Sequence, residues 1–228
     1  MTIHQDIHML WLKLNMATHQ LFRRVGAKRG SRIPADCLID FDRHRLGRDK
    51  FSAESREIVD VLRSKGFEAY VVGGAVRDLL VGLTPSDEDI VTDAKPEWIA
   101  QFFKRSYVIG RRHKLVHIHK GRKIFEVSTY RKASKSETGK KNRAKDCYGS
   151  VHDDVKRRDF SANALYYCPV SQNIIDFVGG YEDIQSKRLE VIGDADQRLA
   201  EDPVRILRAL RLSAKLDFVM PSSLSYAI

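Results

Sequence analysis

YVVGGAVRDLLVGLTPSDEDIVTDA, residues 70–94, is the stretch that decides the fold. The apolar run Ala69–Val72 predicts a short buried strand, and the pair Gly73-Gly74 follows it directly. Ala75–Val81 then has a helical pattern that ends at a glycine. Free backbone N–H groups at the start of such a helix, together with the helix dipole, favour a bound phosphate. The stretch therefore predicts a phosphate-binding turn between a strand and a helix.

Three acidic residues, Asp87-Glu88-Asp89, follow this helix and lead into an apolar strand pattern. On a strand, residues i and i+2 share a face, so Asp87 and Asp89 project together while Glu88 points away. Two adjacent carboxylates repel each other, and Mg²⁺ is commonly held by carboxylates together with substrate phosphates. Taken alone, a glycine pair is more often a plain turn, and an Asp-x-Asp pair is more often a solvated surface pair. Their order along the chain, with Arg77 in the helix between them, indicates nucleotidyl transfer.

The composition is that of a folded chain without a membrane span. Its 228 residues are 43% hydrophobic and 31% charged, enough for one full core or one domain plus part of a second. No stretch approaches the roughly 18 apolar residues that a span needs. Cys37, Cys147 and Cys168 are widely spaced, which argues against a zinc site and a disulfide framework and predicts a location in the reducing cytoplasm.

The net charge of +10 is concentrated in one segment. Residues 111–145 hold 13 Lys and Arg but 2 Asp and Glu, so the remainder of the chain carries −1. A local basic excess favours a polyanionic partner such as RNA. For residues 132–146, a solvated loop rich in lysine is an equal alternative.

Local patterns divide the rest of the first half. Residues 1–50 are predicted to be a partly disordered N-terminal extension, with Ser31–Lys50 as an irregular lead-in. Ser52 is the expected cap of a helix over Ala53–Lys65, and Pro96 opens another helix. Leu115–Lys120 and Lys123–Tyr130 flank a Gly-Arg turn and predict a hairpin.

The second hairpin strand carries a glutamate among apolar residues. Its alternation places Ile124, Glu126, Ser128 and Tyr130 on one face and Phe125, Val127 and Thr129 on the other. Beside a pair of aspartates, Glu126 is the candidate third carboxylate of a two-metal site.

The C-terminal part turns helical. Asn173–Val178 predicts a short strand, and Leu189–Ile192 predicts another. Asp202-Pro203 is a capping and first-turn signal for a helix over Val204–Leu216. Its predicted apolar side consists of Ile206, Leu207, Leu210 and Ala214, and its basic stripe consists of Arg205, Arg208, Arg211 and Lys215.

The strings GGAVRDLL (73–80) and GLTPSDEDIVTDA (82–94) resemble the head of the polymerase-β-like nucleotidyltransferases, and within these the bacterial poly(A) polymerase and CCA-adding enzyme family. EVSTYR (126–131), RRDFSANAL (157–165) and EDPVRILRALR (201–211) resemble further motifs of that family. One departure is Glu88, which stands where these proteins usually carry an aromatic residue. The resemblance covers about residues 50–218.

This resemblance implies an α+β fold in two parts. A nucleotidyltransferase head, a small mixed sheet with helices, is expected over residues 51–180. The first helices of an α-helical neck are expected over residues 181–228, without the RNA-binding body and tail of longer family members.

The resemblance also implies a reaction and a set of site residues. The reaction is attack by an RNA 3′-hydroxyl on the α-phosphate of a nucleoside triphosphate, assisted by two Mg²⁺ ions. The implied catalytic residues are Asp87, Asp89, Glu126 and Asp159, of which the first three hold the metal. The implied nucleotide-binding residues are Gly73, Gly74, Arg77, Arg158, Asp202, Arg205 and Arg208, with an Asp and an Arg of the neck helix reading the base edge.

Several functions remain open at this point. Addition of AMP from ATP to RNA 3′ ends is favoured, because VIGRRHKLVH (108–117) resembles a segment typical of bacterial poly(A) polymerases, with His113 in place of an expected Phe. Addition of CCA to tRNA is the alternative, since both activities share the motifs of the head. An inactive RNA- or nucleotide-binding remnant is a third possibility, and nucleotide transfer to a small molecule is disfavoured by the basic segment.

Overall fold

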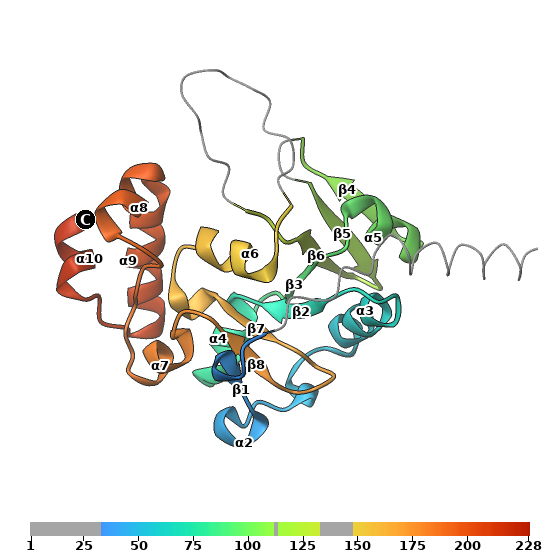
Figure 1. The fold of residues 1–228 in the computed structure, drawn as a ribbon, viewed down its shortest axis with the longest axis horizontal. Helices are drawn as coiled ribbons and strands as arrows, with labels where there is room; N and C mark the ends of the chain where they lie inside the picture. The colour runs from blue at the N-terminus through green and yellow to red at the C-terminus, as the bar shows by residue number, and fades with distance from the viewer. Residues whose placement is uncertain (1–32, 112–113, 133–147) are drawn as a thin grey trace, which may run out of the picture.

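The computed structural model describes residues 33–111, 114–132 and 148–228 (Figure 1). This part of the chain contains a mixed sheet of eight strands in the order β1-β8-β7-β2-β3-β6-β5-β4. Neighbouring strands are antiparallel except β3 and β6, which are parallel. The strands are β1 (Leu38–Ile39), β2 (Ala69–Val72), β3 (Asp89–Thr92), β4 (Ser106–Ile109), β5 (Leu115–Lys120), β6 (Lys123–Thr129), β7 (Leu165–Tyr167) and β8 (Ile174–Asp176).

Helices and 3₁₀ turns cover the sheet, and further helices follow it at the C-terminal end of the chain (Figure 1). The α-helices are α2 (Phe41–His44), α3 (Ala53–Ser64), α4 (Gly74–Leu80), α5 (Pro96–Phe102), α6 (Val151–Arg157), α7 (Gly180–Gln185), α8 (Ala195–Glu201), α9 (Val204–Leu216) and α10 (Ser222–Ala227). The 3₁₀ helices are η1 (Ala35–Cys37), η2 (Arg48–Lys50) and η3 (Ser161–Asn163). The predicted α+β architecture is therefore confirmed.

The middle strands are buried on both faces, which explains why β2 reads as a continuous apolar run. One face packs with the buried side chains of α3 and α5, among them Ile58, Leu62 and Ile99. The opposite face packs against α6, whose Val151 and Val155 lie in the second core cluster. Alternation along each strand decides which side chain enters which cluster.

Several predicted elements are confirmed, with bounds within a few residues. Helix α3 starts after Ser52, whose hydroxyl accepts a hydrogen bond from the backbone N–H of Ser55. Helix α5 begins at Pro96, and α9 covers the predicted residues 204–216. The hairpin of β5 and β6 has the predicted alternation, since Phe125 and Val127 are buried while Glu126 is exposed.

The interpretation of Ser31–Lys50 as an irregular lead-in is wrong for its described part. Strand β1 pairs with β8 at the edge of the sheet, and Ile39 and Leu46 are buried in the main core. A two-residue strand leaves little periodic signal, so its partner β8 defines it rather than its own sequence. Residues 1–32 lie outside the described residues.

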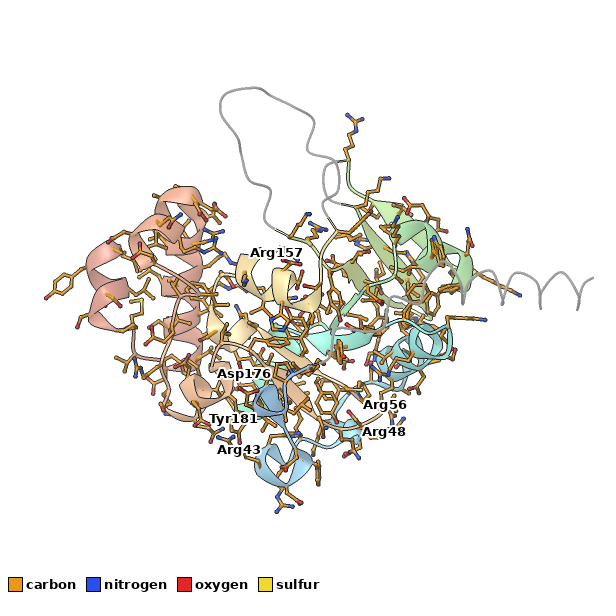
Figure 2. All side chains as sticks on the ribbon, in the orientation of Figure 1. Arg43, Arg48, Arg56, Arg157, Asp176 and Tyr181 are labelled. Carbon is orange, nitrogen blue, oxygen red and sulfur yellow. The ribbon has the colours of Figure 1, made fainter. Side chains whose placement is uncertain are left out.

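Contacts with α7 hold this N-terminal segment in place, as Figure 2 shows around Arg43, Asp176 and Tyr181. The Asp176 carboxylate accepts four backbone N–H groups, from residue 178 to Tyr181, and so caps the start of α7. The Tyr181 hydroxyl donates to the carbonyl of Arg43 at 3.0 Å, and the Arg43 guanidinium lies 5.3 Å from the Tyr181 ring centroid.

The predicted strand over Leu189–Ile192 needs correction. Leu189–Ile192 forms no strand but belongs to a segment with isolated bridges, from Arg188 to Val219 and from Val191 to Phe160.

No helix in the described part of the chain is long and apolar enough to cross a membrane.

The predicted apolar side of α9 is also wrong except for Ile206, which is partly buried against the main core. Leu207 is 67% exposed and Leu210 is 45% exposed, whereas Ala209 and Leu216 are buried. In this rotation of the helix, Ile206, Ala209, Leu212 and Leu216 pack against the core. Arg208 pairs with Asp159, and Lys215 pairs with Asp78.

Candidate active site

A cavity of about 240 Å³ opens where the end of β2 and the start of β3 face helix α9. Seven of the eleven site residues expected from the sequence line it, namely Gly73, Gly74, Arg77, Asp89, Arg158, Asp159 and Arg208. The remaining lining residues are Asn163, Arg211, Leu212 and Lys215. The cavity thus brings together motifs that lie far apart in the sequence.

In the turn between β2 and α4, the backbone conformation favours glycine at the first position of the pair. Gly73 has φ 77° and ψ −130°, a conformation that side chains strongly disfavour. A Cβ atom there would lie 3.7 Å from Nη1 of Arg158, and a Cβ on Gly74 would lie 3.5 Å from Nη2 of Arg77. The turn is therefore flanked by two guanidinium groups, an arrangement suited to a phosphate chain.

The Arg77 guanidinium is buried and fixed by its neighbours. Its Nε and Nη2 donate to Oδ1 of Asp78 at 2.9 and 2.6 Å, and its Nη1 donates to the side-chain oxygen of Asn163. The second oxygen of Asp78 accepts from Nζ of Lys215 on α9 at 2.7 Å. A guanidinium has five N–H donors, so these bonds leave donors for an anion in the cavity.

Helix α6 positions the second guanidinium through residues spaced three and four apart. The Asp154 carboxylate is fully buried and accepts hydrogen bonds from Nε of Arg157 at 2.9 Å and Nε of Arg158 at 3.1 Å. It also accepts from the Tyr166 hydroxyl at 2.9 Å. Asp154 and Tyr166 therefore hold Arg158 against the glycine turn.

Protonation states follow from this network. Burial alone would raise the pKa of Asp154, but the charges of Arg158 and Arg157 outweigh it, and the pKa lies below its usual value. Burial would lower the pKa of Arg158, but Tyr166 and Asp154 outweigh it and raise that pKa. Arg158 is thus a permanent cation beside the cavity.

The acidic side of the site lies on β3 and β6. The parallel register pairs Ile90 with Val127, so Asp89 and Glu126 stand one residue earlier on the same sheet face. Desolvation by the surrounding protein, followed by the charges of Asp87 and Glu126, raises the pKa of Asp89 to about 6, while Arg158 opposes the shift. Asp87 precedes β3 rather than lying on it, so the strand argument for its direction fails although its charge acts on Asp89.

Glu88 points away from this acidic group, as predicted. Its carboxylate accepts a hydrogen bond from the backbone N–H of Ser52 at 2.9 Å and another from the Ser52 hydroxyl at 2.8 Å. Glu88 therefore ties the start of β3 to the start of α3, which accounts for a charged residue at this position.

The donor set fits magnesium. The described residues contain no group of three or more His, Cys, Asp or Glu side chains that would hold a metal by themselves. Mg²⁺, however, is usually held by one or two carboxylates together with substrate phosphates and water. Desolvation first, and the charges of Asp87 and Glu126 second, raise the pKa of Asp89, and a divalent cation would offset both effects.

Asp159, which precedes η3, forms an ion pair with Arg208 of α9. Its Oδ2 accepts from Nε of Arg208 at 2.6 Å, and its Oδ1 accepts from the backbone N–H of Phe160 at 2.8 Å and from Nδ2 of Asn163 at 3.3 Å. The cavity is therefore closed on one side by an ion pair between the sheet domain and the helix.

Two residues expected to read the base, Asp202 and Arg205, do not line the cavity. Asp202 is exposed and accepts from the backbone N–H of Val204 at 3.2 Å. Arg205 donates to the Glu201 carboxylate at 3.1 Å and to the carbonyl of Arg198.

Sequence reasoning missed Asn163, Arg211 and Lys215 as residues of the site. The signal for each was present, because Asn163 lies within the motif RRDFSANAL and the two basic residues belong to the stripe of α9. What the sequence could not show is that this stripe faces Asp78 and Asp159 rather than solvent.

Comparisons with known proteins agree with this fold. Poly(A) polymerase I of Haemophilus influenzae is 43% identical over 181 residues, which cover 75% of this chain and 40% of that protein. The crystal structure of the Bacillus stearothermophilus CCA-adding enzyme in complex with CTP has a TM-score of 0.68 at 34% identity, covering 77% of this chain and 42% of that one. The Thermotoga maritima CCA-adding enzyme complexed with tRNA has a TM-score of 0.67 at 25% identity, covering 84% and 44%.

The chain therefore spans about two fifths of the length of the relatives that it matches. Residues 69–190 match the family described as the poly A polymerase head domain, and they include the glycine turn, the acidic residues and the α6 network. This chain belongs to the poly A polymerase head domain family.

Proposed function

We propose that this protein is an RNA nucleotidyltransferase that transfers AMP from ATP to RNA 3′ ends. The observation that carries the proposal is a cavity with two fixed guanidinium groups on one side and an acidic group at its edge. Cationic donors suit a triphosphate, and clustered carboxylates suit the metal that accompanies it. Poly(A) polymerases among the relatives are 35–43% identical and CCA-adding enzymes are 35–38% identical, so the preference for AMP addition rests on residues 108–117, which resemble a segment typical of bacterial poly(A) polymerases.

Each side of the cavity has its own task in this reaction. Arg77 and Arg158 hold the triphosphate beside Gly73-Gly74, and their fixed positions lower the cost of ordering it. Asp87, Asp89 and Glu126 would hold Mg²⁺, which when bound lowers the pKa of the attacking hydroxyl and neutralises charge on the departing pyrophosphate.

The nucleoside lies toward α9 in this proposal. Asp159 and Arg208, already paired across the cavity, contact the ribose and the base. Asp202 and Arg205 would read the base edge only after Arg205 leaves Glu201, which is a rearrangement of the start of α9. Asp202→Ala should then lower ATP incorporation and let UTP compete better, because Asp202 accepts from an exocyclic amine that uracil lacks.

Addition of CCA to tRNA is the second candidate, because solved relatives of similar fold are CCA-adding enzymes. A partial tRNA substrate and an oligo(A) substrate separate the two. We expect the protein with Mg²⁺ to incorporate labelled ATP into oligo(A) in preference to CTP. Incorporation of both CTP and ATP into tRNA lacking its CCA end, with none into oligo(A), would establish CCA addition instead.

No incorporation of any nucleotide under either condition would favour an inactive binding protein. The basic residues 133–145, to which RNA affinity was ascribed in part, lie outside the described residues. Cys37 and Cys168 are free thiols, consistent with the proposed cytoplasmic location.

A further inference from the structure

Within residues 33–111, 114–132 and 148–228, helices cover only part of the width of the sheet face that carries Asp89 and Glu126. Helix α6 packs on the part formed by the middle strands, where Tyr70, Val91 and Tyr166 are buried. In Figure 1, α6 lies over these strands, and β4 forms the far edge of the sheet. Toward that edge the same face carries exposed apolar and aromatic side chains, of which Tyr107 is 58% exposed and Ile124 is 54% exposed.

Register places these side chains in line with the acidic group. Glu126 on β6 pairs with His117 on β5, and His117 pairs with Tyr107 on β4. Nε2 of His117 lies 3.3 Å from Oε1 of Glu126. The Tyr107 ring packs edge-on against His119, with a centroid distance of 5.2 Å and an interplanar angle of 81°. A row of rings therefore runs from Glu126 to the edge of the sheet.

The reaction geometry tells which substrate would meet this surface. In phosphoryl transfer the attacking and leaving oxygens are roughly in line on opposite sides of the phosphorus. The cavity with its guanidinium groups lies on one side of Asp89, and Glu126 lies on the other and does not line the cavity. With the pyrophosphate on the cavity side, the attacking hydroxyl approaches from the side of Glu126.

We propose that the exposed face of β4–β6, with Tyr107 on its edge strand, binds the last unpaired nucleotides at the 3′ end of the RNA. This inference rests on the proposed nucleotidyl transfer and adds the surface that receives the second substrate. Single-stranded RNA is commonly held by bases that stack on aromatic and imidazole rings. Tyr107 and His119 supply such rings next to the carboxylate that the 3′-hydroxyl must reach.

Stacking contributes to the affinity of this surface in addition to charge. Lys114, Lys120 and Lys123 flank it, but each is within 4 Å of a glutamate on α3 or α5. Their charges are thus partly neutralised within the protein. A base stacked on an aromatic ring contributes to affinity for any base sequence.

The test is the affinity for a fluorescently labelled single-stranded oligo(A), measured by anisotropy on the full chain. Tyr107→Ala should weaken binding about tenfold, whereas Tyr107→Phe keeps the ring and should bind within about twofold of the wild type. Tyr226→Ala is the matched control, because Tyr226 on α10 is 90% exposed. The KM for oligo(A) should rise in Tyr107→Ala while the KM for ATP stays unchanged.

The outcomes separate this inference from the function on which it rests. Normal oligo(A) binding by Tyr107→Ala in a protein that incorporates AMP would overturn the inference alone. Tyr107-dependent binding without incorporation of any nucleotide would overturn the proposed function alone. A changed oligomeric state of Tyr107→Ala with unchanged RNA affinity would show a protein contact and would also overturn the inference.

Discussion

Asp154→Asn should destabilise the protein by about 3–5 kcal/mol, the usual cost of removing one partner from a buried ion pair. The Asp154 side chain has no exposed surface and is the acceptor for Arg157, Arg158 and the Tyr166 hydroxyl. Arg157, labelled in Figure 2, is 32% exposed, so solvent replaces much of its lost partner. Arg158 is 16% exposed, and most of the cost arises from this cation.

Urea unfolding at pH 7 measures the effect, because a shift of the midpoint at constant slope reports a change in stability. Asp153→Asn is the matched control, since Asp153 lies in the same helix and takes part in the capping box with Ser150. Loss of that cap should cost about 1 kcal/mol. Equal losses for the two variants would refute the assignment of Asp154 as the residue that holds Arg158.

The same variant has a defined pH dependence. The pKa of Asp154 is depressed in the folded protein, so its stabilisation is present above the usual Asp pKa of about 3.9 and is lost as the pH falls through the lowered value. The stability difference between wild type and Asp154→Asn should be constant from pH 5 to 8 and shrink below about pH 4. A difference that persists unchanged at lower pH would argue against an ionised Asp154.

Two further predictions concern a close backbone contact and the acidic group. In Gly180→Ala the new Cβ would lie 2.1 Å from the carbonyl oxygen of Ser161, so we expect a loss of at least about 2 kcal/mol in thermal unfolding. Gly179→Ala is the control, because a Cβ there meets nothing within 4 Å. It should lower the stability by only about 1–2 kcal/mol, the cost of a side chain at positive φ. Equal losses of stability in the two variants would contradict the close packing of α7 on η3. Since the pKa of Asp89 is raised to about 6, its contribution to stability is present below the usual Asp pKa and is lost as pH rises toward 6. In the absence of metal, the stability of Asp89→Asn relative to wild type should therefore increase between pH 4 and 6. A difference in unfolding free energy that does not change with pH in chemical unfolding would contradict the raised pKa of Asp89.

Local sequence signals predicted those parts of the fold in which neighbouring residues decide the outcome. The strand, glycine pair and helix of residues 69–80 depend on backbone chemistry within a few residues. The hairpin and its exposed Glu126 follow from alternation. The Ser-x-x-Asp signal of Ser150 and Asp153 was equally local, and the start of α6 could have been predicted from it.

Other features depend on partners that are distant in the chain. The face of α9 depends on distant partners, since Arg208 pairs with Asp159 and Lys215 with Asp78, and counting its apolar residues could not reveal these partners. The role of Glu88 depends on Ser52, which lies 36 residues away. Arg205 is occupied by Glu201, a contact one helical turn away that the base-reading interpretation had not considered.

The most direct test of the account is nucleotide incorporation by three variants that each remove one carboxylate charge at nearly constant volume. Asp89→Asn and Glu126→Gln should lose AMP incorporation by at least about a thousandfold, since an amide cannot neutralise Mg²⁺. Glu88→Gln is the matched control, because its side chain bonds to Ser52 and stays away from the acidic group. We expect it to remain within about fivefold of the wild type, a loss below about 1 kcal/mol. Substantial activity in Asp89→Asn, or a loss in Glu88→Gln as large as that in Asp89→Asn, would contradict the assignment of Asp89 and Glu126 as the catalytic carboxylates.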